Sequence, residues 1–390
     1  MPKNKKKRNA NGNGSITKRA DGRWEGKYTV PADDGSTRCV RKSVYGKTKE
    51  EVRKKLTQIQ YEIDNNLFIN PTKMTLCSWI DTWLNDYVKH SVKALTYDSY
   101  YSLSNNHIKP VLGDVVLTKL TTDRIQKFLN YLLDEKNLSV KTVKNISGVL
   151  HKALEQAFIV GHIKANPCNR TQLPKAPKKK IKPMSNENIE LFLKTIKGHK
   201  FENIYYVTLF TGLREGEVLG LTWDCVDFKN NTILVNKQLK KNTQYAGSTH
   251  ILSSTKNGEE RIIRVAPSVM LVLARHQKIQ EKMADKAGCA WNNEWNLVFT
   301  NEFGGFVSHA TVYNNFKRIV KQLGIPEMRF HDLRHTYATI SLESGDDFKT
   351  VQSNLGHATA SFTLDVYGHV SDGMKEKSAR NIQQFINKVS

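Results

Sequence analysis

The sequence predicts a multidomain protein: a small α+β domain with a three-stranded sheet and one helix, an all-α domain of four helices, and a mostly helical domain with a small antiparallel sheet. Three observations predict this fold. Strand-like segments precede a helical segment in the first 66 residues, apolar residues recur every three or four positions over residues 75–166, and residues 185–390 are mostly helical with one strand-like interruption. The 390 residues, 39% of them hydrophobic, suffice for two or three cores.

The chain is strongly basic, with a formal net charge of +23. This charge indicates an anionic partner, with nucleic acid the first candidate and an anionic membrane surface the second. No apolar run of about 18 residues is present to span a bilayer. We interpret residues 1–14 as a disordered basic tail, which contacts phosphate or only aids solubility. Five scattered cysteines without a C-x-x-C pair are typical of free thiols in a reducing cytosol, so we expect a cytoplasmic protein.

Residues 15–66 predict three strands followed by a helix. Two strands flank a turn at Asp21 and Gly22, and Thr48 with Glu51 forms a capping-box pattern that starts the helix. One helix covers only one face of such a sheet, and the other face is left to basic side chains interleaved with aromatic ones. A sheet of this width fits a DNA major groove, and a solvated polar face is the alternative. The basic residues are Lys18, Arg19, Arg23, Lys27, Arg38, Arg41 and Lys42.

Residues 75–166 predict a bundle of four amphipathic helices. Apolar residues from Leu76 to Tyr87 fall at three- and four-residue intervals, and Thr96, Thr121 and Ser139 are the predicted caps of the later helices. We expect these apolar residues, several of which are aromatic, to form the core of the bundle rather than a cofactor site.

Residues 167–184 form a linker rich in proline and lysine. Proline blocks helix formation and like charges repel, so the segment is expected to be extended. A basic tether between two basic domains suits a protein that closes around a duplex as a clamp, with a plain spacer as the alternative. The predicted DNA-contacting lysines are Lys178, Lys179 and Lys180.

The stretch HDLRH, which starts at His331, raises the question of a metal site. His331 and His335 have the spacing of two zinc ligands on one helical face, with Asp332 where a zinc peptidase carries its glutamate. Arg334 argues against a metal, because a fixed cation beside a dication is repulsive and no third ligand is obvious nearby. We predict an anion site, in which Arg334 forks onto two oxygens and His331 donates alongside it.

A second arginine, Arg214, follows Gly212 at the start of a predicted helix and lies within an apolar run. An arginine in such surroundings needs an anionic partner. Glu217, one turn further on, either supplies that partner or orients the arginine. The apolar neighbours are Leu209, Phe210, Leu213, Val218 and Leu219.

TGLREGEVLGLTWDCVD, HDLRHTYAT and LGHATASFTLDVYGHV occur in this order and spacing within residues 185–390. They resemble the motif boxes of the tyrosine recombinase (phage integrase) family. The first two segments fit the larger members of that family, the lambda-type and conjugative-transposon integrases. The resemblance implies an arm-type DNA-binding domain at 15–66, a helical core-site DNA-binding domain at 75–166, and a catalytic domain at 185–390.

The resemblance also implies roles for single residues. Arg214 and Arg334 would hold the scissile phosphate, with Glu217 as a supporting acid. His331 would be the base or hydrogen-bond partner, His357 would bind the phosphate, and Tyr367 would be the nucleophile. Lys256, on a strand-turn-strand stretch, fits the family lysine better than Lys240 or Lys241 and would protonate the leaving hydroxyl. Tyr313 and Tyr337 compete with Tyr367, but Gly368 after Tyr367 leaves its backbone free to move.

Such a site implies a site-specific recombinase that cuts and rejoins DNA through a 3′-phosphotyrosyl intermediate, with no metal, no ATP and no other cofactor. The alternatives are a type IB topoisomerase-like nicking and closing enzyme and a catalytically inactive DNA-binding regulator. The implied partners are double-stranded DNA at core and arm-type sites, other copies of the chain in a tetrameric synapse, and an excisionase or host DNA-bending protein. The implied location is the nucleoid of a bacterial host.

Overall fold

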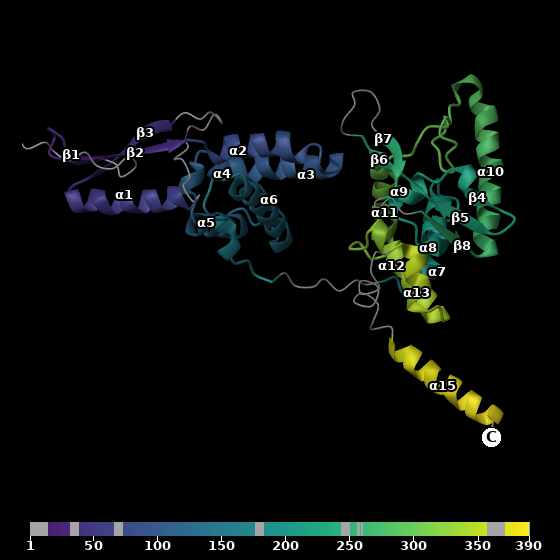
Figure 1. Cartoon of the computed structure of the whole chain (residues 1–390). Coiled ribbons are helices and arrows are strands. Elements are labelled where there is room, and N and C mark those ends of the chain that lie inside the picture. The colour runs from purple at the N-terminus through teal and green to yellow at the C-terminus, as the bar shows by residue number, and fades with distance from the viewer. Residues whose placement is uncertain are drawn as a thin grey trace, which may run out of the picture. The chain divides into compact units, whose positions relative to one another are not determined.

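The computed structural model describes residues 15–31, 39–65, 73–175, 183–242, 250–255, 258, 260–356 and 371–389 (Figure 1). The chain divides into two compact units, Met1–Ala176 and Pro177–Ser390, which are described separately. Several predictions fall outside the described residues: the basic tail at 1–14, and the DNA contacts of Arg38, Lys178, Lys179 and Lys180.

The first unit begins with the predicted three-stranded sheet and helix. Strands β1 (Ser15–Lys18), β2 (Trp24–Pro31) and β3 (Cys39–Gly46) pair antiparallel in that order, and α1 (Lys49–Asp64) follows. Thr48 caps α1 as predicted, because its side chain accepts from the Glu51 amide; the Glu51 carboxylate accepts from the amide of Lys47, the residue before the cap. Helix α1 packs so closely on β2 that a Cβ added to Gly26 would lie 2.6 Å from Val52 Cγ1.

The rest of this unit is helical. It contains α2 (Leu76–Thr82), α3 (Ala94–Leu103), α4 (Lys109–Leu112), α5 (Thr122–Asp134) and α6 (Val140–Ile159). Thr121 and Ser139 cap α5 and α6 as predicted. Thr96 is not a cap, and that prediction was wrong: the amides of Thr96 and Tyr97 both donate to the carbonyl of Lys93, so the first turn of α3 closes three residues earlier.

Most side chains of the predicted apolar stripe from Leu76 to Tyr87 are buried, as expected. Trp79 and Trp83 are buried, but Tyr87 is 40% exposed. The cause is a π-helical turn at Trp83–Val88, whose wider turn rotates later side chains out of phase with the 3.6-residue period. Val88 therefore takes the inward position instead of Tyr87.

The second unit is mostly helical with small antiparallel sheets, as predicted. Strands β4 (Val226–Asp227), β5 (Thr232–Val235) and β8 (Arg261–Arg264) form one sheet, and β6 (Lys237–Lys241) pairs with β7 (His250–Ser254) in another. The helices are α7 (Asn186–Ile196), α8 (Glu202–Thr211), α9 (Glu215–Leu219), α10 (Pro267–Ala287), α11 (His309–Gln322), α12 (Phe330–Ser344), α13 (Phe348–Leu355) and α15 (Ser371–Val389).

The strand-like interruption predicted within residues 185–390 is divided among short strands, and β5 ends and β6 begins on either side of Asn236. The two strands pair differently: Val235 lies opposite Arg261 of β8, whereas Lys237 lies opposite Ser254 of β7. Strands β7 and β8 therefore belong to different sheets. The predicted turn at Lys256, between these two strands, lies largely outside the described residues.

Helix α9 and strand β6 approach each other backbone to backbone. Gly216 and Gly220 lie on the contact, and a Cβ added to Gly220 would lie 2.5 Å from the Leu239 amide nitrogen. His309 at the start of α11 fixes the same strand, since its Nε2 lies 3.0 Å from the carbonyl oxygen of Leu239. This packing sets the position of α9, which carries the first predicted site residues.

We expect Gly220→Ala to lower the free energy of unfolding of the second unit by about 1–3 kcal/mol, because the new methyl group overlaps β6 backbone that has little room to move. Urea denaturation measures the change. The control is Gly148→Ala in α6, where an added Cβ meets nothing within 4 Å. It should stabilise the helix by about 0.5–1 kcal/mol. An unaltered midpoint for Gly220→Ala would contradict the close packing.

Candidate active site

The end of α8 places Arg214. Gly212 ends this helix in the left-handed region with φ +65°, and a Cβ there would lie 2.4 Å from the ring of Tyr337. Glycine is therefore required for both its backbone angle and its size. The chain turns, Leu213 is buried, and Arg214 becomes the residue that precedes the first turn of α9.

Glu217 is held by two arginines. Arg214 Nη1 donates to Glu217 Oε1 at 2.6 Å, and the Arg214 amide donates to Oε2 at 3.0 Å. Arg261, on β8, donates through Nη1 to Oε1 at 3.1 Å and through Nη2 to Oε2 at 2.6 Å. Burial by itself raises the pKa of this carboxyl, but the hydrogen bonds and positive charge of Arg261, followed by Arg214, lower the pKa of Glu217 to about 2.

Arg334 lies close to the same turn. It is 1% exposed, its Nη1 donates to the carbonyl of Gly212 at 2.7 Å, and its Nη2 donates to the carbonyl of Leu355. Arg214 Nη2 donates to the next carbonyl along, Gly356, at 2.9 Å. The structure thus brings the two predicted arginines together between the Gly212 turn and the end of α13, and it buries Arg334 against carbonyl groups.

His331 and His335 lie on the first turns of α12, with ring centroids 5.0 Å apart and the rings nearly perpendicular at 89°. As a residue, His331 reaches the surface, whereas His335 is buried. Partial burial of the imidazole, followed by the charge of Arg334, lowers the pKa of His331 to about 4. Burial and the neighbouring His331 lower the pKa of His335 to about 4 as well. His331 is therefore neutral at pH 7 and able to accept a proton or a hydrogen bond. Within the described ranges, no three His, Cys, Asp or Glu side chains form a metal cluster.

Lys256, His357 and Tyr367 lie outside the described residues. The two alternative lysines, Lys240 and Lys241, lie on β6 opposite Ile251 and His250.

Arg261 was missed by the sequence analysis. The signal that identifies it is the alternation in β8: Arg261 shares a face of the strand with Ile263, which is buried. A basic residue on the inward face of a strand requires a carboxylate or carbonyl partner.

The predicted DNA-binding residues of β1–β3 divide between the two faces of the sheet. Lys27 and Arg41 lie on the face that α1 leaves open, in register with Ser43 and Thr29. Lys42 lies opposite the buried Tyr28, which places it on the side covered by α1. Lys18 lies opposite Trp24, which shares the covered face with Gly26 and Tyr28. The open face is thus less basic than predicted, since two of its expected lysines, Lys18 and Lys42, belong to the other side.

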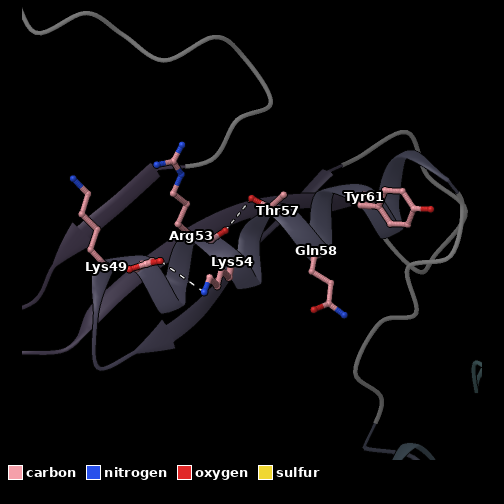
Figure 2. Close-up of a pocket in the computed structure, with 7 residues that line it drawn as sticks. Lys49, Arg53, Lys54, Thr57, Gln58 and Tyr61 are labelled. Carbon is pink, nitrogen blue, oxygen red and sulfur yellow. Dashed lines mark hydrogen bonds and ion pairs between the residues drawn. The ribbon is translucent and has the colours of Figure 1, made fainter.

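The turn between β1 and β2 holds two further predicted arginines. Arg23 donates through Nη2 to Asp21 at 2.7 Å, and Arg19 donates to the hydroxyl of Tyr45 at 3.3 Å. Lys18, at the end of β1, is exposed. Positive charge also follows the outer side of α1, where Figure 2 shows a surface hollow. The residues that Figure 2 labels along it are Lys49, Arg53, Lys54, Thr57, Gln58 and Tyr61.

None of the helices that the structure describes combines the length and the apolar character needed to cross a bilayer.

Comparisons with known proteins find chains that are similar in sequence and in fold. The phage integrase family model matches residues 182–374, and the model of the phage integrase N-terminal SAM-like domain matches residues 75–133. A tyrosine recombinase XerC-like protein of Caldanaerobacter subterraneus subsp. tengcongensis is 31% identical, over 90% of this chain and 94% of the relative.

Two solved structures are similar in fold. The integrase of the Tn1549 transposon, in complex with transposon right end DNA, superposes with a TM-score of 0.68 at 24% identity, over 79% of this chain and all of that one. Lambda integrase, as a tetramer bound to a Holliday junction, superposes with a TM-score of 0.56 at 19% identity, over 88% of this chain and 96% of that one.

The buried ion pairs of Glu217 predict a pH dependence. Because its pKa is lowered to about 2 in the folded chain, Glu217 contributes stability above its unfolded pKa and loses it as the pH falls from about 5 towards 2. We expect Glu217→Gln to lower the free energy of unfolding by about 3 kcal/mol at pH 7, and the gap to the unsubstituted chain to narrow below pH 5 and close towards pH 2. Urea denaturation at several pH values measures the gap. Glu215→Gln, at the next carboxylate of α9, is the comparison; a gap for Glu217→Gln that stays constant with pH would contradict the ionised pair.

Proposed function

The chain belongs to the phage integrase family and is a tyrosine-type site-specific DNA recombinase, and from this we propose that Arg214, Lys256, His331, Arg334, His357 and Tyr367 carry out its strand transfer, with Glu217 in support. The observation that carries the proposal is the convergence of two arginines from separate motifs on one place. Arg334 donates to the carbonyl of Gly212, two residues before Arg214, while both arginines donate to consecutive carbonyls at the end of α13.

In the proposed reaction the hydroxyl of Tyr367 attacks the DNA phosphorus. The new bond joins the tyrosine oxygen to phosphorus, and the bond from phosphorus to the 5′-oxygen breaks. His331 takes the tyrosine proton, and Lys256 gives a proton to the departing 5′-oxygen. The product is a 3′-phosphotyrosyl ester together with a free 5′-hydroxyl. Attack by the 5′-hydroxyl of a second strand reverses these steps and rejoins the DNA without ATP.

The arginines supply electrostatic stabilisation. Negative charge develops on the non-bridging oxygens of the phosphate during attack, and guanidinium groups held beforehand meet that charge without reorganisation; each such donor lowers the barrier by about 3 kcal/mol. His357 would hydrogen-bond to the same phosphate. The lowered pKa of His331, about 4, keeps its ring neutral at pH 7, so the ring is able to accept a hydrogen bond from the tyrosine hydroxyl as that hydroxyl attacks.

The remaining segments bind DNA in this proposal. The sheet domain at 15–66 takes arm-type sites. The helical stretches 76–88, 94–112, 122–134 and 140–159 form a four-helix core-site domain within 75–166, the linker 167–184 follows the DNA backbone, and 185–390 is catalytic.

By analogy with the transposon integrase on its DNA and the lambda tetramer, the chain assembles as a tetramer and moves a mobile element, at the nucleoid in the cytoplasm of a bacterial host. An excisionase or host DNA-bending protein would set its direction. Neither a nicking-closing enzyme nor an inactive regulator is favoured.

Tyr367→Phe is expected to abolish covalent attachment to a nicked suicide substrate while DNA affinity stays within about twofold, because only the nucleophilic oxygen is lost. Denaturing gel electrophoresis detects the adduct, and fluorescence anisotropy measures affinity. Tyr313→Phe, at an exposed tyrosine of α11, is the matched control and should keep the adduct. An adduct formed by Tyr367→Phe would assign the nucleophile to another residue.

The terminal helix α15 is proposed to dock on a neighbouring copy. Ile382, Phe385 and Ile386 are exposed and lie at positions i, i+3 and i+4, which is one helical face. Deletion of the residues after Met374 should leave binding to a single core site unchanged and weaken cooperative binding to paired sites, as measured by gel shift. Gln384→Ser, at a polar position of the same helix, is the control. Unchanged cooperativity of the shortened chain would rule out this docking.

A further inference from the structure

Arg261 has no role in the chemistry described so far, yet it contacts both sides of the candidate active site. Its Nη1 and Nη2 donate to the two oxygens of Glu217, and its Nε donates to the carbonyl of Asn354 at 2.8 Å. Only 12% of its side chain is exposed. All three nitrogens of this guanidinium therefore have protein acceptors, which suits a residue that holds other groups in place.

Arg261 fixes the carboxylate that Arg214 depends on. A guanidinium that donates to both oxygens of a carboxylate sets the plane of that carboxylate as well as its position. Arg214 then donates through a single side-chain nitrogen to Oε1, the oxygen that Arg261 Nη1 also contacts. The orientation of Arg214 therefore follows from that of Arg261, with Glu217 as the link.

Arg261 also holds the other partner of Arg214. The end of α13 presents consecutive carbonyls, of which Asn354 accepts from Arg261, Leu355 from Arg334 and Gly356 from Arg214. Gly356 adopts φ +62°, and a Cβ added to it would lie 3.1 Å from Arg261 Nη1. The guanidinium of Arg261 thus packs against the residue whose carbonyl receives Arg214.

We propose that Arg261 is a positioning residue for strand cleavage: it holds Glu217 and the end of α13 in place so that Arg214 meets the scissile phosphate. This inference rests on the proposed role of Arg214. The charge count agrees with it, because one carboxylate neutralises one guanidinium: the guanidinium of Arg261 contacts both oxygens of Glu217, whereas the guanidinium of Arg214 contacts only Oε1. The positive charge of Arg214 is thereby left in excess for an anion.

The test compares Arg261→Lys and Arg261→Gln with Arg264→Gln, an exposed arginine on the same strand. Single-turnover cleavage of a suicide substrate gives the rate, anisotropy gives the affinity, and thermal unfolding gives the stability. We expect Arg261→Lys to fold, to bind DNA within about twofold of the unsubstituted chain, and to cleave about 10- to 100-fold more slowly, because an ammonium keeps the charge but cannot hold two oxygens and a carbonyl in one plane. Arg264→Gln should cleave at the unsubstituted rate.

Two further readouts separate positioning from general stability. In a chain that already carries Glu217→Gln, the addition of Arg261→Gln should slow cleavage by a further factor of less than about two, because Arg261 acts on Arg214 through Glu217. The charged groups that face Glu217 are Arg214 on its own helix and Arg261 on β8. Arg261→Gln should raise the pKa of Glu217, so cleavage should begin to fail at a higher pH on the acid side.

The proposal is overturned if a folded Arg261→Lys chain cleaves at the unsubstituted rate, if cleavage and affinity fall by the same factor, or if the Arg261 and Glu217 effects are additive. If Arg261→Gln does not fold, Arg261→Lys still decides the outcome, because it keeps the buried charge. Failure of the unsubstituted chain to form any adduct would count against the proposed function and not against the role of Arg261.

Discussion

The second unit depends on one buried carboxylate. Glu217 is 3% exposed and has a guanidinium on each side, from Arg214 and from Arg261. Removing these charges from water costs several kcal/mol per ion, which only close geometry recovers. The ion pairs connect α9, β8 and, through the arginines, the end of α13. Three segments distant in the sequence are thereby held in one arrangement, and loss of Glu217 leaves the buried guanidinium of Arg261 without its anionic partner.

Backbone carbonyls complete this arrangement. Gly212, Leu355 and Gly356 each end or follow a helix, where the last carbonyl groups have no partner within the helix. Arginine suits these positions because its planar fork reaches two carbonyls at once. Both glycines adopt positive φ, so the chain turns sharply enough to aim the carbonyls at the guanidinium groups. The same arginines therefore cap the helices and, in the proposed mechanism, hold the phosphate, which links the stability of this region to its proposed chemistry.

Local signals in the sequence predicted much of the fold. The caps at Thr48, Thr121 and Ser139 depend on a few neighbouring residues and were confirmed. The prediction that Thr96 caps a helix was wrong because the first turn of that helix closes earlier, on the carbonyl of Lys93. The prediction that Tyr87 belongs to the buried stripe was wrong because a π-helical turn changes the helical period. Both errors arise where backbone hydrogen bonds depart from the regular pattern, which no side-chain periodicity reveals.

The candidate site was predictable to the extent that its residues lie in recognisable motifs. Arg214, Glu217 and Arg334 were identified from the sequence, but their partners were not, because carbonyl acceptors carry no sequence signature. Arg261 needed a different argument, since a charged residue on the inward face of a short strand must find an acceptor across the fold, and here that acceptor is 44 residues away. The shared carboxylate links α9, which carries Arg214 and Glu217, to β8, which carries Arg261, so this geometry forms only when segments far apart in the sequence meet.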